Sequence, residues 1–327
     1  MAVYFLNVKT FGRTGGSSAV SAAAYRAGER LRDERTGKTY DHSGRQDIMH
    51  KEIVLPSKFA DSELAWADDR ASLWNAAESA EMRKNARVAR EFLVALPVEL
   101  SPLQRIGLVS GFSRELCDRY GFAVDFAIHA PRDFPGSDPR NFHAHLLATT
   151  REATLGGLGS KTTLEMNDTD RRKLGLAPAI NELLHVRARW ATVTNEALEE
   201  AHIAARIDHR SLEAQGIDRE PQPQIPRAAF EMERHGNRSV IAERLREEYR
   251  ARVQERLARA AARESSAGPG RSKAEPHSAE ARAAALPQSL DDIRREARES
   301  WLRQRQSGVE AARSVATDRV HDDDFAR

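Results

Sequence analysis

Two short apolar segments on either side of a proline-rich stretch constrain the fold most. FAVDFAIHA (122–130) and NFHAHLLATT (141–150) have the length and the aliphatic and aromatic content of β-strands. The stretch between them, PRDFPGSDPR, contains three prolines and one glycine, which is typical of a loop. The pattern therefore predicts a strand, a loop and a second strand that pairs antiparallel with the first.

The rest of the first 220 residues alternates predicted strands and helices. Apolar runs that end at a proline, such as EIVLP and REFLVALP, predict strands, and Ala-rich or amphipathic stretches predict helices. Ser101 and Pro102 fit the N-cap and first turn of a helix that runs to about Tyr120. Strands are expected at 2–10, 52–56 and 90–97, and the other helices at 18–31, 61–88 and 178–202. This order predicts an α+β fold, with a mainly antiparallel sheet and helices mainly on one face.

The composition argues against several classes of protein. The 51 Lys+Arg and 49 Asp+Glu give a net charge of +2, which does not by itself indicate a nucleic-acid-binding protein. The chain has no long uncharged apolar run, and MAVYFLNVKT lacks the basic lead of a signal peptide, so neither a transmembrane helix nor a leader is expected. Cys117 is the only cysteine, which excludes an intramolecular disulfide and a cysteine-built zinc site. We therefore expect a cytoplasmic protein.

The character of the chain changes after Pro221. PQPQIP (221–226) predicts a linker, and 239–263 has apolar residues at a spacing of four, which predicts a helix with one apolar stripe. A breaker-rich stretch at 265–278 is expected to be disordered, and a second helix is expected at 289–304. The predicted domains are thus residues 1–220 and a helical, partly disordered extension at 221–327.

Three histidines on the two strand candidates are the strongest sign of chemistry. His143 and His145 are two residues apart, so on a strand they point to the same face. His129 ends the preceding strand, and if the two strands pair, all three imidazoles can converge. Three nitrogen ligands leave open positions on a divalent cation, as a catalytic metal needs. Imidazole suits Mn²⁺, Zn²⁺, Co²⁺ or Ni²⁺ better than Mg²⁺; a solvent-facing pair of histidines is the alternative.

Tyr25 is the candidate nucleophile, in the Ala-rich segment SAAAYRAGERL. A helical tyrosine more often serves packing, but this one follows a Gly-rich entry and lies among Arg13, Arg26 and Arg30. A phenol is a poor nucleophile at neutral pH because its pKa is about 10, and nearby cations favour the phenolate. A tyrosine can also hold a phosphoryl group as a stable phosphodiester. Tyr40, in a turn-rich stretch, is the rival nucleophile.

Two further polar features stand out. Glu91 lies on the otherwise apolar strand REFLVALP, where it could form an edge salt bridge, orient a metal-binding histidine or accept a proton from Tyr25. RIDHRSLEAQG (206–216) is a dense polar segment that follows the long helix. It is either a structural cap or a contact to phosphate or the DNA backbone. Arg13, Arg26 and Arg210 are the candidate DNA-binding residues.

Together these segments resemble the MobA/MobL (MobQ-type) plasmid relaxases of the HUH endonuclease superfamily. The resemblance runs from Met1 to about residue 220, and no single segment decides it. It consists of the N-terminal strand followed, in order, by RTGGSSAVSAAAYRAG, the strand with Glu91, IHAPRDFPGSDPRNFHAHLL and ARIDHRSLEAQGI. It implies a central, mainly antiparallel sheet with helices packed on its faces.

The resemblance also implies an activity. Family relaxases nick one DNA strand at a plasmid transfer origin, and a tyrosine keeps the 5'-phosphate while a 3'-hydroxyl is released. Tyr25 would be the nucleophile, and the three histidines would bind the metal, with Mn²⁺ expected first and Mg²⁺, Zn²⁺, Co²⁺ and Ni²⁺ as alternatives. Glu91 would be a base or a histidine-orienting group. The implied partners are single-stranded origin DNA, accessory mobilisation proteins and a type IV secretion coupling protein. The resemblance also implies that the relaxase is transported with the DNA into a recipient cell.

One departure and three alternatives stay open. Several family members have a second carboxylate two residues after the glutamate, where this chain has Leu93, so another group could activate Tyr25. A rolling-circle replication initiator or transposase would use the same chemistry; some initiators carry two tyrosines on one helix, and positions 21, 22, 28 and 29 here hold none. A DNA-binding auxiliary protein and an ordinary histidine-metal hydrolase are the others.

Overall fold

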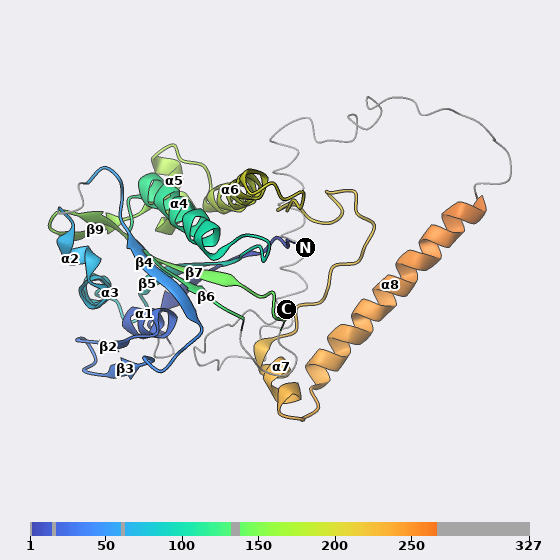
Figure 1. The fold of residues 1–327 in the computed structure, drawn as a ribbon, viewed down its shortest axis with the longest axis horizontal. Coiled ribbons are helices and arrows are strands. Elements are labelled where there is room, and N and C mark those ends of the chain that lie inside the picture. The colour runs from blue at the N-terminus through green and yellow to red at the C-terminus, as the bar shows by residue number, and fades with distance from the viewer. Residues whose placement is uncertain (1, 15–17, 60–62, 132–137, 267–327) are drawn as a thin grey trace. The chain divides into compact units, whose positions relative to one another are not determined.

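A five-stranded antiparallel sheet forms the centre of the N-terminal part of the chain. The computed structural model describes residues 2–14, 18–59, 63–131 and 138–266. In spatial order the strands are β1 (Leu6–Gly12), β5 (Arg87–Ala95), β7 (His143–Thr149), β6 (Val124–His129) and β4 (Ile48–Val54), and every neighbouring pair is antiparallel (Figure 1). The α+β class and the antiparallel pairing of the two histidine-bearing strands are therefore confirmed.

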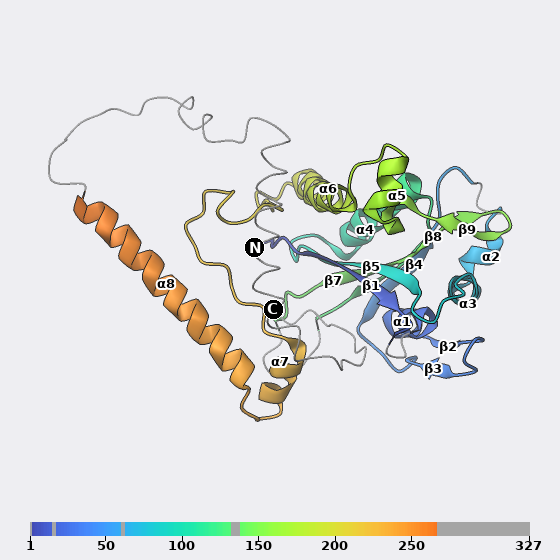
Figure 2. The same ribbon diagram turned by 180° about the vertical axis from the view of Figure 1, so that it is seen from behind.

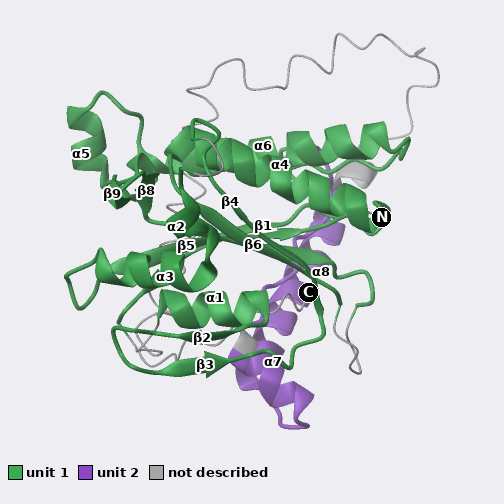
Figure 3. Cartoon of the chain, turned by 60° about the vertical axis from the view of Figure 1, so that its left-hand side comes forward, with its two compact units in different colours: residues 1–215, 320–327 green, residues 216–319 purple. Residues whose placement is uncertain are grey.

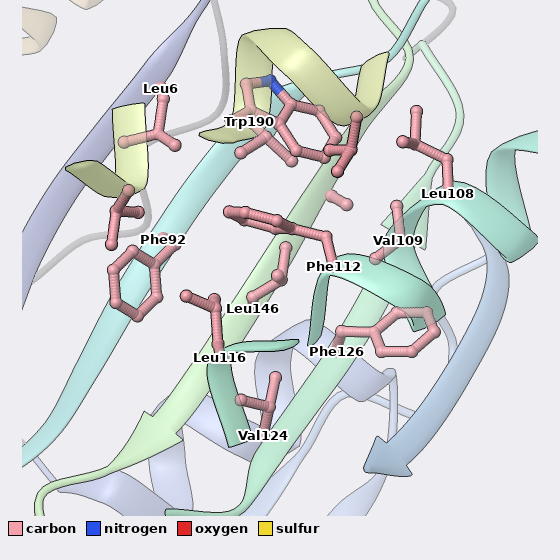
Figure 4. Packing of buried hydrophobic residues seen from close by; sticks show 14 of the residues in the cluster. Leu6, Phe92, Leu108, Val109, Phe112, Leu116, Val124, Phe126, Leu146 and Trp190 are labelled. Atoms are coloured by element: carbon pink, nitrogen blue, oxygen red, sulfur yellow. The ribbon is translucent and has the colours of Figure 1, made fainter. Parts of the chain in front are cut away.

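One face of the sheet packs against the two longest helices of this part. Helices α4 (Pro102–Tyr120) and α6 (Ala179–Glu200) contact each other and cover a buried apolar cluster. Phe92 of β5 and Leu146 of β7 belong to this cluster, and the rings of Phe112 and Trp190 lie 5.0 Å apart between the helices (Figure 4). Strand residues two apart share a face, so these side chains alternate with others that point the opposite way.

The opposite face carries a second layer, formed by α1 (Ala19–Ala27) and α3 (Arg70–Ser79) (Figure 2). Its core includes Ala23 of α1, Trp74 of α3 and Leu147 of β7, all fully or almost fully buried. The expectation of helices mainly on one face is wrong, because β6 and β7 are buried along their whole length and need cover on both sides. Helices on both faces are what the family resemblance implies.

Several element ends differ from the predictions for local reasons. The helix expected over 61–88 is two, α2 (Ala65–Asp68) and α3, because the side chain of Asp69 accepts the Ser72 N–H and caps a new helix. The helix expected over 18–31 ends at Ala27, where Gly28 takes a φ of +60° that glycine adopts without strain. The remaining elements described before residue 216 are β2 (Arg30–Arg32), β3 (Thr39–Asp41), β8 (Arg151–Thr154), β9 (Gly157–Lys161), a 3-10 turn (Thr163–Glu165) and α5 (Asp168–Lys173).

The start of α4 is fixed by the predicted cap. Ser101 Oγ accepts the Gln104 N–H at 3.3 Å, and Gln104 Oε1 accepts the Ser101 N–H at 2.9 Å. Ser101→Ala removes one arm of this capping box, so we expect it to lower the free energy of unfolding by about 1 kcal/mol in urea titrations. Thr192→Ala is the control, because this exposed hydroxyl only bonds a carbonyl of its own helix. Equal stability of the two variants would refute the role of the cap.

The chain divides into two compact units, with the boundary between Gln215 and Gly216 (Figure 3). The described part of the second unit holds α7 (Arg227–Arg234) and α8 (Val240–Ser266), so the helix expected at 239–263 is present. Of the stretch expected to be disordered, residues 265–266 belong to α8, and 267–278 lie outside the described residues. The helix expected at 289–304 also lies outside them, and the division at 220 stays a prediction. None of the helices in the described ranges is both long and apolar enough to cross a membrane.

Candidate metal centre

Three buried imidazoles meet at one end of the central strands. His129, at the end of β6, pairs in register with His143, at the start of β7, and His145 follows two residues along β7 on the same face. The ring centroids lie 4.7 to 5.3 Å apart, and one nitrogen from each ring lies within 4.8 Å of the others. The three rings face the layer that contains α1, because His145 alternates along β7 with Leu146 of the α4–α6 cluster.

Hydrogen bonds to oxygen atoms fix the orientation of each ring. His145 Nδ1 donates to Glu91 Oε1 at 2.7 Å, His143 Nδ1 to the Asn141 carbonyl at 3.0 Å, and His129 Nε2 to the Arg26 carbonyl at 2.8 Å. In a neutral imidazole the other nitrogen then carries the lone pair. His145 Nε2 is buried with no hydrogen-bond partner among the described residues. A buried lone pair in a cluster of three imidazoles is the donor arrangement that a divalent metal requires.

The electrostatics of the site keep the imidazoles of His129 and His145 neutral. Burial, helped by the other two histidines, lowers the pKa of His129 to about 2. Burial also lowers the pKa of His145, to about 4, although the carboxylate of Glu91 opposes the shift. Neutral rings retain the lone pairs that ligation needs, whereas protonated ones cannot bind a cation.

Glu91 lies on β5, the strand next to the one that carries His145, and its side chain is fully buried. Besides His145, its carboxylate accepts a hydrogen bond from Arg26 Nε, and Lys9 Nζ lies 3.2 Å from Oε2. Burial alone would raise the pKa of Glu91, but Arg26, His145 and Lys9 together hold it well below its ordinary value. Glu91 is therefore a fixed anion that orients an imidazole, and a proton-accepting role would have to overcome three cationic or donor neighbours.

Tyr25 lies in the last turn of α1, on the same side of the sheet as the three histidines. Ser18 caps this helix, and its alanines let the helix approach the sheet closely. The guanidinium of Arg45 lies over the Tyr25 ring, 3.9 Å from the ring centroid, and the same side chain reaches His129 Nδ1 at 3.5 Å. The ring of His42 meets that of Tyr25 edge-on at 5.1 Å. One side chain thus touches both the candidate nucleophile and a candidate ligand.

Arg45 belongs to a polar, turn-rich stretch, where no sequence motif marks it as a site residue. Its guanidinium pairs with Asp47 through Nε at 2.9 Å and through Nη2, and Nη1 donates to the Tyr25 carbonyl at 3.1 Å. Burial would raise the pKa of Asp47, but Arg45 lowers it to about 2, so the pair stays ionised. The spacing Arg-x-Asp is the one local signal for this pair, and it does not reveal the contact with Tyr25.

Comparisons with known proteins match the whole of this region. The model of the MobA/MobL family matches residues 17–235, which include Tyr25, Glu91 and the three histidines. This chain belongs to the MobA/MobL family. It is 36% identical over 281 residues to the mobilization protein MobL of Acidithiobacillus ferridurans, an alignment that covers 80% of this chain and 71% of the relative.

Two further proteins are similar to this chain. The 43 kDa relaxation protein of Salmonella typhimurium is 36% identical over 235 residues, which cover 67% of this chain and 57% of the relative. A solved structure that describes the molecular basis of vancomycin resistance transfer in Staphylococcus aureus aligns with a TM-score of 0.52 at 30% identity, over 64% of this chain and all of that one. The chain thus spans 71% and 57% of these two curated relatives.

Two arginines that are candidate DNA contacts by sequence are bonded within the protein. Arg26 is buried and bonds Glu91 and the Ala22 carbonyl. Arg13, whose side chain is 9% exposed, bonds Glu78 and carbonyl groups of the segment that follows α3. Both guanidiniums are engaged with the protein itself, so the structure argues against direct DNA contact by either of them.

Arg210 and Tyr40 occupy more exposed positions. The side chain of Arg210 is 44% exposed and makes a bidentate pair with Asp208, which leaves a DNA contact open as a prediction. Tyr40 lies on the small β2–β3 sheet, paired in register with Leu31, and burial together with Asp33 raises its pKa. A raised pKa disfavours the phenolate, so the surroundings of Tyr40 do not suit a nucleophile.

Proposed function

We propose that this chain is a metal-dependent relaxase that nicks one DNA strand at a transfer origin. The observation that carries the proposal is the convergence of three buried imidazoles beside Tyr25, with Arg45 in contact with both. The family membership and the names of the relatives, which include mobilization and relaxation proteins, support the same activity. We assign His129, His143 and His145 to the metal and Tyr25 to the nucleophile.

The reaction we propose is a transesterification. Tyr25 Oη forms a bond to the scissile phosphorus, the bond from phosphorus to the 3'-oxygen breaks, and the proton lost by the phenol is balanced by the one that the 3'-oxygen gains. A bound divalent cation supplies stabilisation of the charge that develops on the phosphate oxygens. The phosphotyrosine ester conserves the energy of the broken phosphodiester bond. Attack by a 3'-hydroxyl on this ester can therefore reseal the strand without ATP.

The chain's own residues prepare this reaction. Glu91 holds His145 in one tautomer, and Arg26 supplies both a charge for Glu91 and, through its carbonyl, the acceptor for His129. We assign Glu91 as a positioning residue because its carboxylate contacts the imidazole and two cations. The substrate must be single-stranded at the nick so that the scissile phosphate can reach the phenol of Tyr25 and the three imidazoles. Accessory mobilisation proteins, a secretion coupling protein and a cytoplasmic location belong to the same proposal.

A gel assay tests the activity and its dependence on metal. Labelled single-stranded oligonucleotides that tile the transfer origin are incubated with the full chain and Mn²⁺, and we expect a covalent protein–DNA band that survives denaturation. EDTA should abolish the band, and a series with Mg²⁺, Zn²⁺, Co²⁺ and Ni²⁺ should restore it to different extents. Cleaved DNA without attached protein would indicate a hydrolase, and binding without cleavage would indicate an auxiliary DNA-binding protein; either outcome contradicts the proposal.

A further inference from the structure

Arg45 occupies a place that no simple packing role explains. Its side chain, 12% exposed, leaves the loop between β3 and β4 and enters the space between α1 and the end of β6. There it meets the ring and the carbonyl oxygen of Tyr25 and the Nδ1 atom of His129. An arginine has donors only, so His129 Nδ1 accepts this bond with the one lone pair that the bond from Nε2 to the Arg26 carbonyl leaves. That lone pair cannot serve Arg45 and a metal at once, so a bound metal would displace this contact and leave Arg45 held by Asp47 and Tyr25.

The guanidinium itself is held by Asp47. The fork-to-fork geometry uses Nε and Nη2, which leaves Nη1 for the Tyr25 carbonyl. Paired in this way, the plane of the guanidinium has one orientation, and the Tyr25 ring stacks against it. A lysine could supply the charge but not the fork or the stacking plane. Asp47 in turn is fixed to the sheet, because its carbonyl accepts the N–H of Ala130, the residue after His129.

We propose that Arg45 is a positioning residue that fixes the Tyr25 phenol relative to the metal-binding imidazoles. The inference rests on the relaxase function proposed above. A displacement of about 1 Å at a reacting group can reduce a rate by about a hundredfold, so the orientation of the ring matters more than its presence alone. Arg45 acts through Tyr25, and it contributes to the rate of strand transfer and not to the capture of DNA.

The test compares Arg45→Met with Arg189→Met. Arg189 also forms a bidentate pair, with Glu115, but it lies between α4 and α6 on the opposite face of the sheet. At saturating oligonucleotide and Mn²⁺, Arg45→Met should form the covalent adduct 10- to 100-fold more slowly, while its affinity for uncleaved oligonucleotide stays within about threefold. Arg189→Met should match the parent protein in both measurements. Asp47→Asn, which weakens the clamp and keeps Arg45, should slow the reaction less.

A second measurement needs neither metal nor activity. The chain has 5 tyrosines, so a protein labelled with ¹³C only at the tyrosine Cζ gives five resonances, and Tyr25→Phe assigns the one of interest. In the metal-free protein, Arg45→Met and Asp47→Asn should shift or broaden the Tyr25 resonance and leave the other four in place. An unmoved Tyr25 resonance, or an adduct rate within twofold of the parent, would overturn the proposal. If the parent forms no adduct at all, the relaxase function fails, and the resonance alone still decides whether Arg45 positions Tyr25.

Discussion

A Tyr25→Phe protein should form no detectable covalent adduct with origin DNA and should still bind the uncleaved oligonucleotide with unchanged affinity. The substitution removes only the hydroxyl, so the ring can keep its stacking on Arg45 and its edge contact with His42. Enzymes that lose a covalent nucleophile lose about 10⁴- to 10⁶-fold in rate. The measurements are the yield of adduct on a denaturing gel and the affinity by fluorescence anisotropy, both with Mn²⁺ present.

Tyr40→Phe is the matched control for this experiment. Tyr40 is the other tyrosine near α1, but it lies on β3 and contributes to the core that packs against that helix. We expect Tyr40→Phe to retain the adduct and at most a small change in stability. An adduct that persists in Tyr25→Phe and disappears in Tyr40→Phe would move the nucleophile to β3 and would remove the basis of the proposed mechanism.

Glu91→Ala should damage both the stability of the domain and the metal site. The variant leaves Arg26 buried without its carboxylate partner, and breaking a buried ion pair from one side typically costs about 3–5 kcal/mol. It also removes the acceptor that orients His145, a type of loss that weakens metal binding by about 10- to 100-fold. Urea unfolding measures the first effect, and Mn²⁺ titration followed by electron paramagnetic resonance measures the second.

A second buried ion pair on the same strand offers a control that separates the loss of stability from the loss of metal affinity. Arg90 points to the other face of β5 and pairs with Glu165 at 2.5 Å, and both side chains are almost fully buried. Glu165→Ala should therefore destabilise the domain on a scale similar to Glu91→Ala but leave the Mn²⁺ affinity unchanged. Equal metal affinity in the two variants would contradict the orienting role of Glu91, whatever their stabilities.

The sheet and its histidines were predictable because they depend on local periodicity. His143 and His145 are two residues apart, so they lie on one face of any strand. The short proline-rich loop predicts that this strand pairs with the one that carries His129. Capping chemistry similarly predicted the start of α4 at Ser101. The structure places all three imidazoles together, and the Mn²⁺ titrations test their assignment as ligands.

The surroundings of the site were not predictable, because they depend on which distant segments meet. An Ala-rich helix such as α1 has no strongly preferred face, so the sequence could not show that Arg26 turns inward to Glu91, 65 residues further along the chain. The fate of Arg13 was hidden for the same reason, since its partner Glu78 lies on α3. Arg45 belongs to a loop whose path is set by tertiary contacts, and no periodic pattern marks such residues.

Two of the ion pairs of β5 also have a consequence for how the sheet assembles. Adjacent residues on the strand carry opposite charges toward opposite layers: Arg90 toward Glu165, and Glu91 toward Arg26. A slip of β5 by one position would exchange the two layers, so that carboxylate would confront carboxylate on one side and guanidinium would confront guanidinium on the other. A register shift of β5 is thus opposed by charge repulsion on both faces of the sheet. The position of Glu91 next to His145 is therefore fixed by charge as well as by packing.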